Sequence, residues 1–306
     1  MESKKRVLLI GLGVIATKYI AGLKDSPYLE LVYTCDINPE APARALLNDI
    51  PFGIDYKEII SSNKIDIAII ATPPSSHFEI INECHKAGLK TIVEKPLCAS
   101  EENCIKLIER ENPNLDVIFH WIEGCEVKWF IENIKLNQIE SININISDPY
   151  ADENGLIKEE YYNKCGCWMD SGVNALSLLS QIIDLESLKV DSFNSKIDTK
   201  SGFPYETLCQ ISSDTTHISI NITWNKMVDR KESLIIADGH IYRLDHSNQS
   251  VSIDGKEVFR DESMPRLAHH YYNYFTNYPH CMSSFETIKI IHNFLFKANS
   301  YEKITA

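Results

Sequence analysis

Short apolar runs rich in β-branched residues alternate with segments of helical spacing over residues 1–120. Runs such as Ile67-Ala68-Ile69-Ile70 are apolar at every position, which predicts strands covered on both faces. The expected strands span residues 6–10, 29–35, 66–71, 91–94 and 116–120, and the expected helices span 14–23, 39–47, 75–87 and 101–110. Strand–helix alternation of this kind predicts a doubly wound α/β domain with a parallel sheet.

The pattern changes after residue 120. Several later runs alternate between apolar and polar residues, as in 218–222, and period-two alternation favours an antiparallel sheet with one solvated face. The expected strands span residues 139–147, 188–193, 206–211, 217–224, 233–237 and 240–244, and the expected helices span 121–136, 171–183, 265–278 and 284–299. We therefore expect two domains, 1–120 and 121–306, the second being α+β with an open, mainly antiparallel sheet.

Composition and charge limit the kinds of binding partner that this chain is expected to have. The 306 residues include 43 acidic and 30 basic side chains, giving a formal net charge of −13. Such a chain repels nucleic acid and anionic lipid, so neither is expected as a partner. The apolar stretch at residues 7–16 is too short to cross a bilayer and lacks a signal-peptide cleavage site. The nine scattered cysteines include no C-x-x-C pair, which favours reduced thiols in a cytoplasmic protein.

The first predicted strand leads directly into Gly11-Leu12-Gly13-Val14-Ile15-Ala16, a G-x-G-x-x-A sequence that opens a helix. The first glycine permits a tight turn, the second lets the backbone approach a pyrophosphate, and a small residue at position 16 packs against the strand. We expect Gly11, Gly13, Val14 and Ile15 to hold a dinucleotide at the helix N-terminus, which identifies the first domain as a Rossmann domain. A plain strand–helix turn is the alternative.

Asp36 directly follows the second predicted strand, about 20 residues beyond the glycine turn, where dinucleotide domains place an acidic residue. Its carboxylate would accept hydrogen bonds from the adenosine ribose and repel a 2′-phosphate. Neither Ile37 nor Asn38 supplies a cation for such a phosphate. We therefore expect NAD rather than NADP as the cofactor.

Two more motifs follow predicted strands, Thr72-Pro73-Pro74-Ser75-Ser76-His77 and Glu94-Lys95-Pro96. Together with the glycine turn and the later Asp170-Ser171-Gly172-Val173-Asn174, they resemble the glucose–fructose oxidoreductase / inositol dehydrogenase family over essentially the whole chain. The resemblance implies that Lys95 is catalytic and that its bond to Pro96 is often cis. It also implies cofactor contacts, which we assign to Thr72, Pro73, His77, Glu94 and Lys95.

Asp170 and Asn174 are four residues apart and project from one face of a helix start. Taken alone, Asp170 would be an N-cap. Most of the family has a histidine base at the position of Asn174, and an amide does not titrate. The hydroxyl proton then falls to Asp170 or Lys95, and Asn174 orients the substrate.

The run at residues 170–176 looks like the subgroup containing L-arabinose 1-dehydrogenase and D-galactose 1-dehydrogenase. Phe119-His120 matches a W-H pair of that subgroup, and Trp224-Asn225 resembles its W-R pair. One departure is Lys164-Cys165-Gly166-Cys167-Trp168, where the subgroup is rich in glycine. Its C-x-C pair lacks the spacing of a metal site, so no metal is expected.

Three more residues are candidates for substrate contact. His120 either contacts a sugar hydroxyl or is a satisfied histidine at a strand end. Trp224 either stacks on a sugar or is a core aromatic. Of His269 and His270, one could reach the substrate, and we select His270.

The resemblance implies an NAD-dependent enzyme that oxidises a sugar, most directly an aldose at C1 to its lactone, with hydride transfer to nicotinamide C4. Oxidation at another carbon of a sugar, nucleotide-sugar or inositol is the first alternative, although no basic cluster marks a nucleotide site. The second alternative is a regulatory protein that binds NAD but has no catalytic activity. The open sheet of this family commonly forms dimers or tetramers, so a homo-oligomer is expected.

Overall fold

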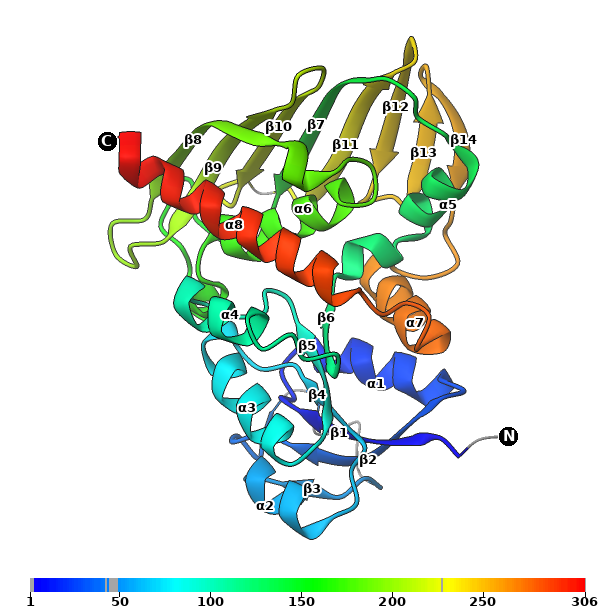
Figure 1. Ribbon diagram of the computed structural model, residues 1–306, viewed down its shortest axis with the longest axis vertical. Coiled ribbons are helices and arrows are strands. Elements are labelled where there is room, and N and C mark those ends of the chain that lie inside the picture. Colours follow the sequence, from blue (N-terminus) through cyan, green and yellow to red (C-terminus); the bar gives the residue numbers. More distant parts are fainter. Residues whose placement is uncertain (1–2, 42, 44–48, 227, 306) are drawn as a thin grey trace. The chain divides into compact units, whose positions relative to one another are not determined.

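The computed structural model describes residues 3–41, 43, 49–226 and 228–305 (Figure 1). The chain forms two compact units. The first unit comprises Met1–Glu123 and Leu267–Lys289, and the second comprises Gly124–Arg266 and Ile290–Ala306. Each unit has its own sheet.

The first unit contains a six-stranded sheet in the order β3-β2-β1-β4-β5-β6, and every neighbouring pair is parallel. Its strands are β1 (Lys5–Ile10), β2 (Leu29–Cys35), β3 (Phe52–Gly53), β4 (Ile67–Ile70), β5 (Lys90–Glu94) and β6 (Leu115–Ile118). All four residues of β4 are at most 2% exposed, as expected for a strand covered on both faces. The predicted doubly wound Rossmann domain is confirmed.

The helices of this unit beside the sheet are α1 (Ala16–Asp25), α2 (Tyr56–Ser62), α3 (Pro74–Lys86), α4 (Glu101–Ile108) and the 3₁₀ helix η2 (His120–Glu123). The helices predicted at 14–23, 75–87 and 101–110 are observed as α1, α3 and α4, with small shifts at their ends. The helix predicted at 39–47 lies largely outside the described residues. The elements β3 and α2 were not predicted, because two and seven residues are too few to show a clear period.

Helix α7 (Arg266–Asn277) packs within the first unit, beside α1 (Figure 1). Its buried Tyr271 and Phe275 join the core around Tyr19. Gly22 on α1 allows this approach, since a Cβ there would lie 2.8 Å from both the Phe275 ring and the Tyr271 carbonyl oxygen. The sequence places residues 267–289 in the second domain, and only long-range packing reveals their place in the first unit.

The second unit contains an eight-stranded sheet in the order β14-β13-β12-β11-β7-β10-β9-β8. Its strands are β7 (Ile139–Ser147), β8 (Lys189–Ile197), β9 (Pro204–Ser212), β10 (His217–Thr223), β11 (Arg230–Ala237), β12 (His240–Asp245), β13 (Ser250–Ile253) and β14 (Lys256–Arg260). The pair β7–β10 is parallel and the other pairs are antiparallel, which confirms the mainly antiparallel prediction. β13 and β14 were missed because they are short and partly polar.

The helical segments of the second unit are α5 (Cys125–Asn133), η3 (Glu159–Lys164), η4 (Trp168–Gly172), α6 (Val173–Leu179), η5 (Leu185–Ser187) and most of α8 (Phe285–Thr305). All seven residues of α6 are buried, and α6 and α8 lie on the same side of the sheet (Figure 1). Segment η4 is a π-helical turn that contains Asp170. The N-cap role considered for Asp170 is therefore wrong, because the helical turn already begins at Trp168.

We expect Asp116, at the start of β6, to make the stability of the protein depend on pH. Its carboxylate accepts hydrogen bonds from the Tyr274 hydroxyl and the Ser283 N–H, but burial dominates and raises its pKa to about 6. A pKa raised by folding adds stability below pH 4, and this stability is lost as pH rises through 6. Asp116→Asn should remove roughly 2–3 kcal/mol of this dependence, measured by urea unfolding between pH 4 and 7.

The matched control is Asp25→Asn, at the exposed end of α1, which should keep the wild-type dependence. If the unfolding free energy of Asp116→Asn depends on pH as it does in the wild type, Asp116 is not the source of this dependence.

Candidate functional site

The glycine turn of the first unit has the geometry of an anion site. Gly11 has φ +95°, and a Cβ there would lie 2.7 Å from the Ala71 carbonyl group, so this position requires glycine. A Cβ on Gly13 would meet nothing within 4 Å, which leaves its backbone open to a ligand. Ile15 provides no side-chain cap for α1, and the first turn has no acidic residue. The positive end of α1 therefore faces no protein carboxylate from its own cap or first turn.

Asp36 is held against this turn by two backbone groups. The Leu12 N–H donates to Oδ2 at 2.7 Å, and the Asn38 N–H donates to Oδ1 at 2.8 Å. The apolar side chains of Val14 and Ile37 nearby in the sequence are 76% and 90% exposed. A carboxylate and two exposed apolar side chains thus accompany the helix N-terminus, a combination suited to a ribose and a flat base.

His77 joins the loops that follow β4 and β5. Its Nε2 lies 2.8 Å from the Thr72 carbonyl oxygen, and its Nδ1 lies 3.1 Å from the Pro96 carbonyl oxygen. The ring is 0% exposed, and burial lowers its pKa. In this structure His77 therefore orients the loops that carry Thr72 and Lys95, rather than presenting its ring at the surface. The Lys95–Pro96 peptide is cis.

Glu94, which precedes Lys95, is buried between two tyrosines. The Tyr19 hydroxyl donates to its Oε1 at 2.8 Å, and the Tyr271 hydroxyl donates to the same oxygen. Burial and the nearby Glu94 carboxylate raise the pKa of Tyr19, so this phenol stays a neutral donor. Neither tyrosine was predicted from the sequence. Tyr271 lies 177 positions from Glu94, and no local pattern connects them.

The two histidines selected for substrate contact meet in the first unit. Nδ1 of His120 lies 3.1 Å from Nδ1 of His270, and their ring centroids are 5.4 Å apart. His120 also stacks on Tyr271 with centroids 5.8 Å apart. Because one ring must donate and the other must accept, this hydrogen bond keeps at least one of the two rings neutral. Both are buried, at 6% and 1% exposure.

Asp170 and Asn174 lie together in the second unit. The Asp170 side chain is 13% exposed, and both of its oxygens lie 3.3 Å from Nζ of Lys164. The Asn174 amide donates from Nδ2 to the Asp170 carbonyl oxygen at 3.3 Å. Its Oδ1 is buried without a hydrogen-bond partner in the described part of the chain. A buried acceptor of this kind is costly unless a ligand satisfies it.

Lys164 was not predicted as a site residue. Residues 164–168 differ from the glycine-rich segment of the similar subgroup, but nothing in the sequence indicated that the Lys164 ammonium would reach Asp170.

Trp224 is 0% exposed, and its ring packs edge-on against Tyr150 with centroids 5.3 Å apart. This burial favours the second of the two alternatives, a core aromatic, and contact of Trp224 with a sugar stays a prediction.

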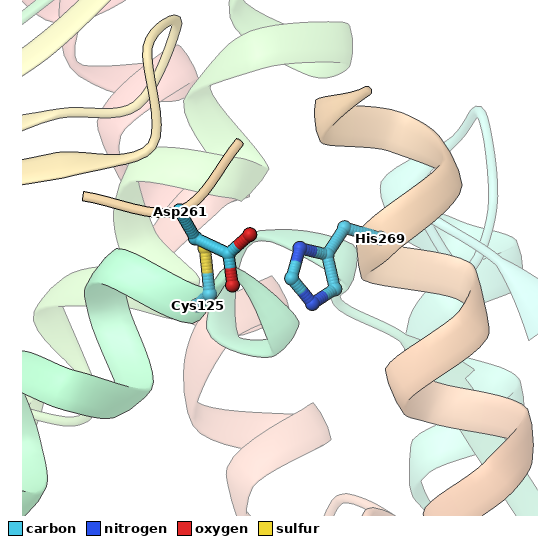
Figure 2. A group of neighbouring side chains, drawn as sticks. All are labelled: Cys125, Asp261 and His269. Carbon is cyan, nitrogen blue, oxygen red and sulfur yellow. The ribbon is translucent and has the colours of Figure 1, made fainter. Parts of the chain in front are cut away.

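The cysteines are free thiols. Cys167 is fully buried beside the Thr207 hydroxyl, and burial raises its pKa to about 12. Figure 2 shows Cys125 and Asp261, which belong to the second unit, and His269, which belongs to the first. These three residues therefore define no site within either unit, and the expected absence of a metal stays a prediction.

Part of the chain matches a known protein family. Residues 5–119 match the model of the oxidoreductase family with an NAD-binding Rossmann fold. This agrees with the family resemblance of the motifs. No helix within the described residues is long and apolar enough to cross a membrane.

The curated relatives match over the same part of the chain. The inositol 2-dehydrogenase/D-chiro-inositol 3-dehydrogenase of Lactiplantibacillus plantarum is 26% identical over 111 residues, covering 35% of this chain and 31% of the relative. The inositol 2-dehydrogenase 1 of Saccharopolyspora erythraea is 24% identical over 110 residues, covering 35% and 33%. The matched segment therefore spans about a third of each relative's length.

Solved structures share the fold over nearly the whole chain. GenD2 from gentamicin A biosynthesis, in complex with NAD, has a TM-score of 0.82 at 13% identity, covering 100% of this chain and 96% of that one. A myo-inositol dehydrogenase from Corynebacterium glutamicum has a TM-score of 0.78 at 16% identity, covering 98% and 96%. The WlbA dehydrogenase from Bordetella pertussis, in complex with NADH and UDP-GlcNAcA, has a TM-score of 0.76 at 16% identity, covering 99% and 96%.

Proposed function

We propose that the protein is an NAD-dependent sugar or polyol dehydrogenase, and that its substrate is an aldose oxidised at C1 to the lactone. The observation that carries this proposal is the position of Lys95. Lys95 directly follows β5, and the glycine turn directly follows β1. Both strands belong to the same parallel sheet. Carboxyl ends of parallel strands share one edge of a sheet, where doubly wound folds bind their ligands.

The cofactor assignment rests on the first unit. The backbone at Gly11, Gly13, Val14 and Ile15 would hold the pyrophosphate, and Asp36 would bind the adenosine ribose. Thr72, Pro73, Glu94 and Lys95 follow or end β4 and β5, and by resemblance they and His77 would flank the nicotinamide. When bound, a nicotinamide accepts the hydride that leaves the sugar carbon.

The proton of the sugar hydroxyl would pass to Asp170, while Lys95 donates a hydrogen bond that favours the alkoxide. An anomeric hydroxyl is more acidic than an ordinary secondary alcohol, so a carboxylate suffices as its base. The unsatisfied Oδ1 of Asn174 would accept a hydrogen bond from a substrate hydroxyl. His120 and His270 would bind other hydroxyls of the sugar.

The direct test is NADH formation, followed by absorbance at 340 nm, with panels of free aldoses, inositols and UDP-sugars. Turnover of an aldose to its lactone supports the proposal. Turnover only of an inositol or UDP-sugar would move the reaction to another carbon, an alternative favoured by the names of the relatives. NAD binding without turnover of any panel member would favour a regulatory protein. The proposal includes a homo-dimer or homo-tetramer, which light scattering checks.

Asp36→Ala is expected to raise the kcat/KM for NADP relative to NAD by about tenfold or more, because the carboxylate that repels a 2′-phosphate is removed. The measurement is the ratio of the two kcat/KM values in the variant and the wild type. Asp55→Ala is the matched control, since Asp55 caps α2 through the Lys57 N–H but is not assigned to the cofactor. An unchanged ratio in Asp36→Ala would show that Asp36 is not the ribose ligand.

A further inference from the structure

Lys164 is brought to Asp170 by a sharp turn of the backbone. The 3₁₀ helix η3 ends at Lys164, and the next two residues, Cys165 and Gly166, have φ +60° and +88°. Gly166 packs against Pro204, since a Cβ there would lie 2.6 Å from the Pro204 Cδ. The Asp170 N–H donates to the Gly166 carbonyl oxygen at 3.1 Å. The turn therefore joins the last residue of η3 to the first residue of η4.

The segment beyond the turn is anchored in the core of the second unit. The thiol of Cys167 lies 3.3 Å from the Thr207 hydroxyl, and the Trp168 indole donates to the Leu295 carbonyl oxygen at 3.0 Å. Both side chains are 0% exposed. Because these contacts fix the backbone on which Asp170 sits, the carboxylate has a defined place within reach of the Lys164 ammonium.

The pairing of Lys164 with Asp170 is symmetrical and partly shielded from water. Nζ lies 3.3 Å from each carboxylate oxygen, and the two side chains are only 30% and 13% exposed. The same Nζ lies 5.0 Å from the centroid of the Tyr150 ring, where a cation is favoured. An ion pair in partly buried surroundings is stronger than one in open water.

The other titratable groups near Asp170 in the described second unit do not replace this cation. They are the Tyr150 phenol and the thiols of Cys165 and Cys167, whose pKa values are all raised, chiefly by burial. These groups are therefore neutral near pH 7. Asp148, joined to the neighbouring Ser171 hydroxyl at 3.4 Å, is paired with Lys231 at 2.7 Å. Lys164 is thus a cation in direct contact with Asp170 within the second unit.

We propose that Lys164 is a positioning residue that keeps the Asp170 carboxylate ionised and fixed, so that it can take the hydroxyl proton. The role of the carboxylate in proton transfer rests on the proposed function, whereas the effect of Lys164 on its ionisation does not. A carboxylate must be ionised before it can accept a proton, and a contacting ammonium favours that form. Lys164 itself is assigned no contact with the substrate.

The first test is independent of turnover. The carboxyl carbon of Asp170 is followed by NMR during a pH titration, with Asp170→Asn to assign its signal. In Lys164→Met the titration midpoint should rise by about one to three pH units, because the contacting positive charge is lost. Lys164→Gln repeats the loss of charge with a polar side chain, and Lys164→Arg should restore the midpoint. Lys158→Met is the matched control, since Lys158 lies over the Tyr161 ring rather than beside Asp170.

The second test is kinetic and uses the sugar identified in the substrate panel. Lys164→Met should lower kcat near pH 7 by about tenfold with little change in KM, and Lys164→Arg should recover it. An unshifted midpoint in both Lys164→Met and Lys164→Gln would overturn the proposal, as would a Lys158→Met shift of the same size. A shifted midpoint in a protein that oxidises no sugar would refute the proposed function and leave the action of Lys164 on Asp170 established.

Discussion

Lys95→Met is expected to lower kcat for sugar oxidation by about 100-fold or more, while the dissociation constant for NADH changes by a much smaller factor. Methionine keeps much of the length and apolar character of the side chain but removes the ammonium that would donate to the reacting hydroxyl. Positioned acid–base groups typically contribute factors of 10² to 10⁴ in rate. The measurements are steady-state kinetics with NAD and fluorescence titration with NADH.

Lys90→Met is the control, because Lys90 begins the same strand β5 that Lys95 follows. Its side chain packs by the Tyr278 ring with Nζ 5.1 Å from the centroid, and burial lowers its pKa. This variant should keep the wild-type kcat. Full activity in Lys95→Met would remove Lys95 from the reaction, and intact biological function without turnover would favour the regulatory alternative.

Gly11→Ala is expected to destabilise the first unit by roughly 3 kcal/mol or more. The added Cβ would stand 2.7 Å from the Ala71 backbone, and the residue would keep a φ of +95° that L-residues rarely adopt. Backbone strain and overpacking each cost about 1–3 kcal/mol. Urea unfolding measures this loss, and NAD affinity should fall with it because the turn is displaced.

Gly13→Ala separates folding from ligand binding at the same turn. A Cβ at Gly13 meets nothing within 4 Å, so the unfolding free energy should change by less than about 1 kcal/mol. The same Cβ would stand where a pyrophosphate approaches the backbone, so the dissociation constant for NAD should rise at least about tenfold. Unchanged NAD affinity in Gly13→Ala would contradict the assignment of this turn to the dinucleotide.

Local sequence accounts for much of the fold and for the motifs of the candidate site. The period of apolar residues predicted β2 and β7 with their observed bounds, because side-chain spacing reflects the pleat of a strand. The glycine turn was predicted since Gly11 needs a backbone conformation that other residues rarely adopt. The short β3, β13 and β14 were missed, because a few residues carry little periodic signal.

By itself, the sequence determined the parallel Rossmann sheet, the mainly antiparallel second sheet and the positions of the glycine turn, Asp36 and Lys95 on the chain. The spacing of apolar residues in a strand and the residue types of a turn both involve neighbours only a few positions apart. Each can therefore be recognised in a short segment of the sequence. Only the tertiary structure decided that α7 joins the first unit, that Tyr271 contacts Glu94, and that His120 and His270 share a hydrogen bond. The tertiary structure also determines that Trp224 is buried and that Lys164 contacts Asp170. These features depend on which surfaces the folded chain brings together, and composition and spacing do not encode such contacts directly.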